Sequence, residues 1–277
     1  MDKICDLHVH SLFSDGSFTP AEIIDGAIKT GLSAVALTDH NTVGGLPDFL
    51  SYAEGKDIEA VAGAEFSVDY NGTELHLLGL FIPREAFGAV EALMQRVNES
   101  KEKSNLDLID SLARSGYPLD YEAMKNSVKG MVNRAVVARA MVEKGYVSSV
   151  KEAFATLLSK DGGHYREPER LTVWETLDFV KSIGAVPVLA HPFLNLTEAE
   201  LIEFLPLAKA RGLLGMECYY SEYDEKLTAR SVEIAREFEL KESGGSDFHG
   251  ASKPSIALGS GMGGLHVPYS CVEALKR

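Results

Sequence analysis

The sequence predicts an α/β protein in which a parallel β-sheet closes into a barrel and carries a small all-helical insert. Apolar segments of strand length alternate with amphipathic helix patterns, an order typical of parallel sheets. Histidine or acidic residues follow several of these segments, and (β/α) barrels collect their functional residues at the carboxyl ends of their strands. Between residues 100 and 168 only helix patterns occur, so we expect an inserted domain there.

The first half of the chain begins with a strand-like segment at residues 4–10. A helix should start at Pro20, because Thr19 and Glu22 have the spacing of a capping box, and Gly31 should end it. The pair Asn71-Gly72 is a strong signal for a β-hairpin. We therefore predict a strand, a short helix, a second strand and a hairpin at residues 34–37, 47–54, 59–64 and 66–81.

Helix patterns dominate the middle of the chain. One pattern runs from Ala86 to about Arg114 and includes a polar stretch at residues 98–103, and others cover residues 133–143 and 149–158. A domain boundary is expected in the polar stretch. The sequence thus predicts a barrel domain made of residues 1–99 and 169–277, with the helical domain at residues 100–168.

The alternation of strands and helices resumes after this insert. Capping boxes at Thr172 and Thr197 predict the starts of two helices, and Gly184 and Gly212 should end them. No glycine-rich dinucleotide fingerprint or phosphate loop follows any predicted strand. The remaining predicted strands cover residues 185–190, 213–220 and 240–245, with a further helix at residues 223–238.

Composition and charge narrow the class of protein. The chain has 277 residues, of which 45% are hydrophobic and 25% charged, and no apolar run approaches the length of about 20 residues that spans a bilayer. Met1-Asp2-Lys3 leads directly into the first strand, so no signal peptide is expected. The three cysteines have no close spacing, which argues against a disulfide framework or a thiolate zinc site. We expect a cytoplasmic protein that does not associate with membranes.

The formal net charge of −14 opposes long nucleic acid as a partner. Bound dications would reverse the local field at their site, however, so an anionic ligand is not excluded. Residues 99–170 carry 12 Lys and Arg against 11 Asp and Glu, a net charge of +1, which leaves −15 for the rest of the chain. An anionic ligand should therefore be tolerated best near the helical insert.

Nine side chains are candidate metal ligands. His8 and His10 stand two residues apart in a strand, so their imidazoles should project from one face. Nitrogen and carboxylate ligands without thiolates favour manganese, ferrous iron or zinc. Because one cation takes about four to six ligands, the set can serve two or three divalent ions. Asp39 is expected to orient a ligand imidazole through its other nitrogen. The candidate ligands are His8, His10, Asp15, His40, Glu65, His76, His191, Asp247 and His249.

The order of these motifs resembles that of the PHP (polymerase and histidinol phosphatase) family. The resemblance implies a distorted (β/α)7 barrel with a trinuclear metal site at its carboxyl-terminal face. It is carried by Asp6-Leu7-His8-Val9-His10, Ser14-Asp15-Gly16, Thr38-Asp39-His40, Ala64-Glu65, Leu75-His76, Ala190-His191-Pro192 and Ser246-Asp247-Phe248-His249. By this resemblance, the first cation would bind His8, His10, Glu65 and Asp247, the second Glu65, His76 and His191, and the third Asp15, His40 and His249.

The helical insert is similar to that of the family's subgroup that acts on nucleotides, which includes AMP and nucleoside 3',5'-bisphosphate phosphatases and a 5'-to-3' exonuclease. We therefore expect hydrolysis of small nucleotide monoesters, in which a hydroxide that bridges two metal ions attacks phosphorus in line. Arg134 is the favoured phosphate contact, since guanidinium groups bind phosphate bidentately. Further expected substrate contacts are Arg139, Arg166 and Tyr165.

Three alternatives remain open from the sequence. A 5'-to-3' exonuclease would act on short oligonucleotides, because the insert lacks the extended basic track that a processive enzyme needs. An amidohydrolase-type enzyme would split carbon–nitrogen bonds, since such barrels also use a His-x-His pair near their start. A metal module without catalysis is disfavoured because the set of ligands is complete. The sequence does not fix the oligomeric state.

Overall fold

The computed structural model describes residues 3–126, 132, 134–159 and 162–276. It divides into two compact units, one formed by Met1–Ala92 with Leu171–Arg277 and the other by Leu93–Arg170. The predicted insert at residues 100–168 lies inside the second of these units. None of the helices in the described residues combines the length and the apolar character that a membrane span requires.

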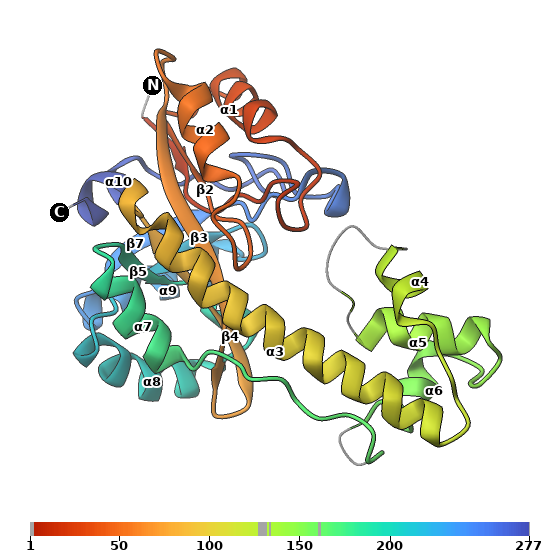
Figure 1. Cartoon of the computed structure of the whole chain (residues 1–277). Helices are drawn as coiled ribbons and strands as arrows, with labels where there is room; N and C mark the ends of the chain where they lie inside the picture. Colours follow the sequence, from red (N-terminus) through yellow and green to blue (C-terminus); the bar gives the residue numbers. More distant parts are fainter. Residues whose placement is uncertain (1–2, 127–131, 133, 160–161, 277) are drawn as a thin grey trace. The chain divides into compact units, whose positions relative to one another are not determined.

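In the first unit, seven strands of the described chain form one sheet in sequential order. The pairs β3–β4 and β4–β5 are antiparallel, and the other neighbours are parallel (Figure 1). The sheet closes between its first and last strands, because the Leu7 amide donates to the Gly244 carbonyl at 3.1 Å. The predicted barrel is thereby confirmed, but its sheet is mixed and not wholly parallel as expected, because β4 is the return strand of a hairpin. The strands are β1 (Cys5–Asp6), β2 (Ala34–Leu37), β3 (Glu59–Tyr70), β4 (Thr73–Leu80), β5 (Val186–Leu189), β6 (Gly215–Tyr220) and β7 (Lys241–Gly245).

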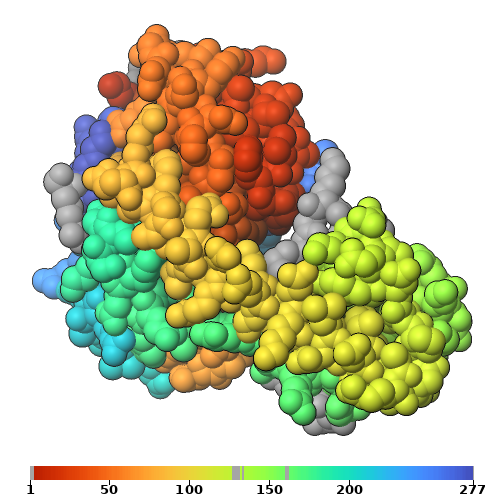
Figure 2. All heavy atoms as spheres, in the orientation of Figure 1, coloured from red at the N-terminus to blue at the C-terminus, as the bar shows by residue number. Residues whose placement is uncertain are grey.

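Helices cover the outside of this barrel. The capping boxes expected at Thr19, Thr172 and Thr197 are all formed, so the sequence located these helix starts correctly. The surfaces of the first two helices are seen side by side in red and orange in Figure 2. The helices of this unit are α1 (Pro20–Lys29), α2 (Leu46–Ala53), α7 (Val173–Ser182), α8 (Glu198–Ala210), α9 (Glu225–Glu237) and α10 (Ser270–Leu275).

The hairpin between β3 and β4 differs from the sequence expectation in one respect. Asn71 and Gly72 form the predicted turn with φ angles of 52° and 86°. Strand β3, however, continues through Glu65 without a break, so this residue lies within a strand and not at its end. His76 pairs with Ser67, two residues from Glu65, and cross-strand partners project from one face of an antiparallel pair. The hairpin therefore brings His76 to the same face as Glu65.

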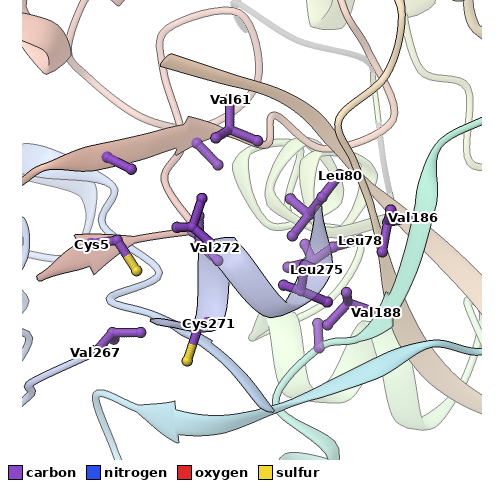
Figure 3. Packing of buried hydrophobic residues seen from close by; sticks show 14 residues of the cluster. Cys5, Val61, Leu78, Leu80, Val186, Val188, Val267, Cys271, Val272 and Leu275 are labelled. Atoms are coloured by element: carbon purple, nitrogen blue, oxygen red, sulfur yellow. The ribbon is translucent and has the colours of Figure 1, made fainter. Parts of the chain in front are cut away.

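Apolar side chains fill the barrel interior at the end where the parallel strands begin. Val272 and Leu275 of α10 are fully buried and pack against Cys5 of β1 and Val188 of β5 (Figure 3). Helix α10 thus closes the end of the barrel at which the parallel strands begin. The polar residues of the interior are left at the opposite end, where these strands finish.

The second unit is helical and has its own core. Helix α3 (Phe87–Arg114) begins in the first unit and ends in the second, and it runs unbroken through the polar stretch at 98–103. Glu and Lys are good helix formers, which explains why that stretch stays helical. Leu108, Leu112 and Met141 are central to the apolar core. The other helices of this unit are α4 (Tyr121–Asn126), α5 (Arg134–Glu143) and α6 (Val150–Ala155).

Candidate metal centre

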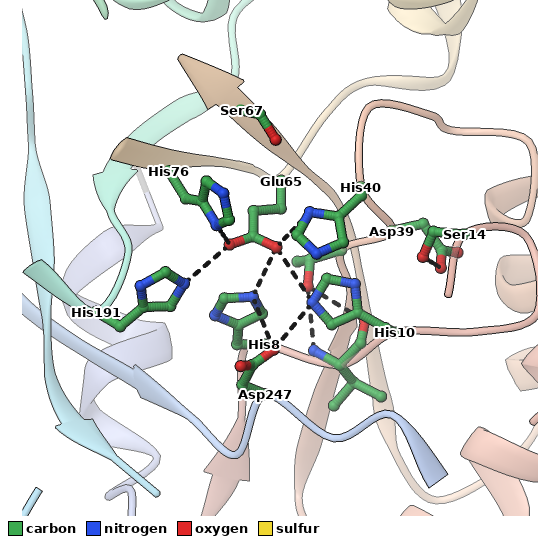
Figure 4. Close-up of polar contacts among 12 residues, drawn as sticks. His8, His10, Ser14, Asp39, His40, Glu65, Ser67, His76, His191 and Asp247 are labelled. Atoms are coloured by element: carbon green, nitrogen blue, oxygen red, sulfur yellow. Dashed lines mark hydrogen bonds and ion pairs between the residues drawn. The ribbon is translucent and has the colours of Figure 1, made fainter. Parts of the chain in front are cut away.

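Glu65 is the centre of the polar cluster at the carboxyl ends of the strands. Its side chain is 1% exposed, and five imidazole rings point toward its carboxylate (Figure 4). Three ring nitrogens face Oε2 at 2.9 to 3.2 Å, and two face Oε1 at 2.7 and 3.1 Å. These rings belong to His8, His10 and His40 at Oε2, and to His76 and His191 at Oε1.

Asp247 adds a second carboxylate beside the paired histidines. Its Oδ1 lies 3.2 Å from His10 Nε2 and 3.7 Å from His8 Nε2. The other oxygen, Oδ2, accepts hydrogen bonds from the Tyr220 hydroxyl at 2.9 Å and from the Lys253 ammonium at 2.7 Å. Asp247 has a φ of 56°, a left-handed conformation that aspartate tolerates better than most residues. One oxygen is thus held by protein donors and the other faces the imidazoles.

Asp15 gathers a further group at the open side of the cluster. Its Oδ1 lies 3.2 Å from His249 Nε2, and its side chain is 56% exposed. His40 Nε2 and His10 Nδ1 each lie 3.8 Å from an Asp15 oxygen. Since the His249 Nδ1 lies 2.8 Å from the Asp247 main-chain carbonyl oxygen, its Nε2 is left to face Asp15. All nine predicted ligands therefore lie in one cluster.

The residues present fit a centre of divalent cations. Several buried nitrogen and oxygen atoms of the cluster have no hydrogen-bond partner within the described chain. This arrangement costs free energy unless another species binds these atoms. Sets of potential ligand atoms lie within 4.8 Å of one another, as two or more cation sites require. The unpartnered atoms of the cluster are His8 Nε2, His10 Nδ1 and Nε2, His40 Nδ1, Glu65 Oε2, His191 Nδ1 and His249 Nε2.

The electrostatics of the cluster favour ionised carboxylates. Burial opposes the charge of Glu65, but the imidazoles of His8 and His40 hold its pKa well below the usual range. Burial likewise opposes the charge of His76, while the Glu65 carboxylate raises the pKa of His76 to about 10. Without a cation, the carboxylate and the rings stabilise one another. Cations held at this cluster would compete with protons for the ring nitrogens.

The comparisons with known proteins decide the family. The chain matches the family model described as PHP domain over residues 6–164. It belongs to the PHP domain family. The resemblance noted in the sequence is therefore confirmed, together with the metal-dependent hydrolase class that it implied.

Relatives named as enzymes that act on phosphate esters cover most of the chain. It is 32% identical to a 5'-3' exoribonuclease of Haemophilus influenzae over 90% of this chain and 91% of the relative. It is 30% identical to a phosphoribosyl 1,2-cyclic phosphate 1,2-diphosphodiesterase of Eggerthella lenta, covering 88% and 94%. A 3',5'-nucleoside bisphosphate phosphatase of Chromobacterium violaceum is 29% identical, covering 88% and 86%.

The fold is also similar to that of solved structures. A proposed metal-dependent phosphoesterase of Bifidobacterium adolescentis superposes with a TM-score of 0.71 and 25% identity, over 99% of this chain and 95% of the other. Together with the relatives, this match assigns the chain to the metal-dependent phosphoesterases of the PHP family.

Asp39 lies beside this PHP centre in surroundings that differ from those expected. Its carboxylate accepts hydrogen bonds from the Ser11 amide at 2.7 Å and from the Ser11 and Ser14 hydroxyls at 2.6 Å. In the described contacts it meets no imidazole. Asp39 and His40 are consecutive in an extended segment, so their side chains project in opposite directions. Asp39 thus anchors the loop that leads to Asp15.

The predicted substrate contacts lie in the helical unit. The Arg134 guanidinium stacks over the Tyr165 ring, 4.1 Å from its centroid, and Nη1 donates to the Leu158 carbonyl at 3.4 Å. Arg139 is exposed on α5, and Arg166 is exposed beside His164. The roles of these residues toward a substrate stay predictions.

Sequence reasoning missed two charged residues at the PHP centre. Glu217 is fully buried on β6 and contacts His8. A single acidic residue within the otherwise apolar strand at 215–220 was a signal that could have identified it. Lys253 follows β7 and pairs with Asp247. It sits in a loop without regular periodicity, so nothing in the sequence pointed to it.

Proposed function

We propose that this PHP phosphoesterase removes phosphate from small nucleotides of the AMP or nucleoside 3',5'-bisphosphate type. The observation that carries the proposal is the convergence of five imidazoles on the two oxygens of Glu65. Relatives that cover most of the chain bear the names of enzymes acting on phosphate esters, one of them a 3',5'-nucleoside bisphosphate phosphatase. The site and the names of the relatives together support this proposed substrate class.

The proposed ligands fall into three sets, two of which share Glu65. Divalent cations bound at such sites polarise phosphoryl oxygens and lower the pKa of bound water to about 7. The chain's own part is to hold the ions at fixed positions. The three sets are His8, His10, Glu65 and Asp247; Glu65, His76 and His191; and Asp15, His40 and His249.

Lys253 supplies a positive charge at the edge of this centre. Its ammonium group lies 2.7 Å from Asp247 Oδ2, and its side chain is 41% exposed. A lysine in this position can reach a ligand that arrives from solvent while remaining close to the proposed ions. We propose that Lys253 contacts the phosphate group of the substrate and offsets part of its charge.

Charge favours a small substrate over a long nucleic acid. The chain carries a net charge of −14, and residues 99–170 carry only +1. Binding a polynucleotide requires several lysine or arginine contacts with successive phosphates, and its affinity depends on them. A nucleotide with one or two phosphates needs only the cation centre and a few basic side chains. The charge of the chain therefore supports a phosphate monoester as substrate over the exonuclease alternative.

A phosphate-release screen tests the proposal. The protein is incubated with AMP, nucleoside 3',5'-bisphosphates, a cyclic phosphodiester and 5'-labelled short oligonucleotides, each with manganese, zinc or magnesium. Release of inorganic phosphate from the first two should exceed release from the others. Shortening of the oligonucleotides by single nucleotides, without phosphate release from any monoester, would favour the exonuclease alternative. Turnover of an amide substrate alone would favour the amidohydrolase alternative.

A further inference from the structure

Glu217 is a buried carboxylate outside the three proposed ligand sets. It lies on β6, in the middle of the barrel wall, and its side chain is fully buried. Each of its oxygens accepts one hydrogen bond. Oε1 lies 3.0 Å from His8 Nδ1, and Oε2 accepts from the His191 main-chain amide at 2.7 Å. One carboxylate therefore joins residues of two different proposed cation sites.

The contact between Glu217 and His8 bears on which nitrogen of the His8 ring carries the proton. A ring nitrogen that binds a cation must carry no proton, so the proton of the neutral ring has to sit on the other nitrogen. His8 Nδ1 faces Glu217, which can only accept, and Nε2 faces Glu65 and Asp247 at 3.2 and 3.7 Å. With a cation in the centre, Glu217 would hold the ring proton on Nδ1 and leave the Nε2 lone pair available to that cation.

The contact with His191 holds an unusual backbone turn. His191 has φ 23° and ψ 58°, and it directly precedes Pro192. Proline disfavours most conformations of the preceding residue other than extended ones, so this turn needs support from its surroundings. Glu217 Oε2 provides that support at the main-chain amide. The turn directs the His191 ring so that its Nε2 lies 3.1 Å from Glu65 Oε1.

We infer that Glu217 is a positioning residue that prepares His8 and His191 together for two cations. The inference rests on the proposed metal ligands and not on the choice of substrate. Its chemical basis is that a carboxylate offers an acceptor to both neighbours, whereas most other side chains cannot. Loss of this one side chain should therefore weaken two sites that it does not itself occupy.

Replacement of Glu217 by glutamine separates this role from simple packing. The amide has nearly the same size, but it has one acceptor and one donor. If its NH₂ group faces His8, the ring must accept at Nδ1, which moves the proton to Nε2 and blocks that nitrogen for a cation. If its NH₂ group faces His191, two donors oppose each other and the turn is disturbed. Either orientation damages one of the two sites.

Metal binding by the full chain provides the test. Wild type, Glu217→Gln and Glu242→Gln are stripped of metal, and manganese and zinc affinities are measured by competition with a chelating dye. Glu242 is the matched control, because it lies on the neighbouring strand β7 and pairs with Tyr219 and Arg236 away from the cluster. Glu217→Gln should lower the affinity by about 10- to 100-fold, the usual effect of a residue that orients a ligand. Glu242→Gln should leave it unchanged.

The outcomes separate this inference from the ligand assignment. Equal affinities in wild type and Glu217→Gln would overturn the inference alone, while a wild type that binds no divalent ion would overturn the ligands as well. Anomalous diffraction from manganese-loaded wild-type crystals gives a second measurement that needs no variant. Peaks within the three proposed ligand sets support the inference, and a peak bonded directly to Glu217 overturns it.

Discussion

Glu65→Gln should abolish most of the activity by weakening two proposed cation sites at once. The carboxylate contacts rings of both sets, with His8 Nε2 and His10 Nε2 at 3.2 Å from Oε2 and His76 Nδ1 at 2.7 Å from Oε1. Replacement of a residue that only orients a metal ligand lowers the metal affinity or the activity by about 10- to 100-fold. A shared ligand counted in two sites should therefore cost about 10²- to 10⁴-fold in kcat/KM, or roughly 3 to 5 kcal/mol.

The assay pairs phosphate release with metal content per chain. Glu59→Gln is the matched control, because Glu59 begins the same strand β3 and its carboxylate binds Tyr269 and Lys276 instead of the cluster. This control should keep both the metal content and the activity of wild type. If Glu65→Gln retained two or more ions per chain and lost less than tenfold in kcat/KM, the central role of Glu65 would be refuted.

Three further predictions address other parts of the molecule. Lys253→Met should raise KM by about tenfold at unchanged metal content, since one charged phosphate contact is worth about 1.5 kcal/mol; a normal KM in steady-state assays would contradict it. Asp39→Ala should release the loop held through Ser11 and Ser14 and lower the occupancy of the site with Asp15, measured as ions per chain at limiting manganese. Leu275→Ala should cost about 2 to 5 kcal/mol of unfolding free energy in urea titrations, because its side chain is fully buried at the barrel floor; a change below about 1 kcal/mol would argue against that packing.

Signals that act over a few residues made much of the fold predictable. The capping boxes at Thr19, Thr172 and Thr197 act within one helical turn, and the turn at Asn71-Gly72 acts within four residues, so each could be found without the fold. The polar residues near the strand ends could be found for a related reason. A histidine or acid that interrupts an apolar pattern is visible in the sequence itself.

Features set by long-range register could not be predicted in the same way. Glu217 meets His8 across 209 positions of the chain. No local pattern contains such a pairing. The contacts of Asp39 were predicted incorrectly for a similar reason. Its serine partners belong to a loop 25 to 28 residues earlier in the chain.

The irregularity of the barrel explains how the ligands of the proposed second cation site can lie so close together. In a regular (β/α) barrel every strand is parallel and contributes only at its carboxyl end. Here β4 runs antiparallel between β3 and β5, so His76 lies inside a strand, diagonal to Glu65. The Ala190 amide donates to the His76 carbonyl at 3.0 Å, which fixes the next residue, His191, beside the same carboxylate. Backbone pairing therefore sets the positions of these three side chains, whereas loops would leave them adjustable. A hairpin in place of one helical crossover supplies the rigidity that a shared metal ligand needs.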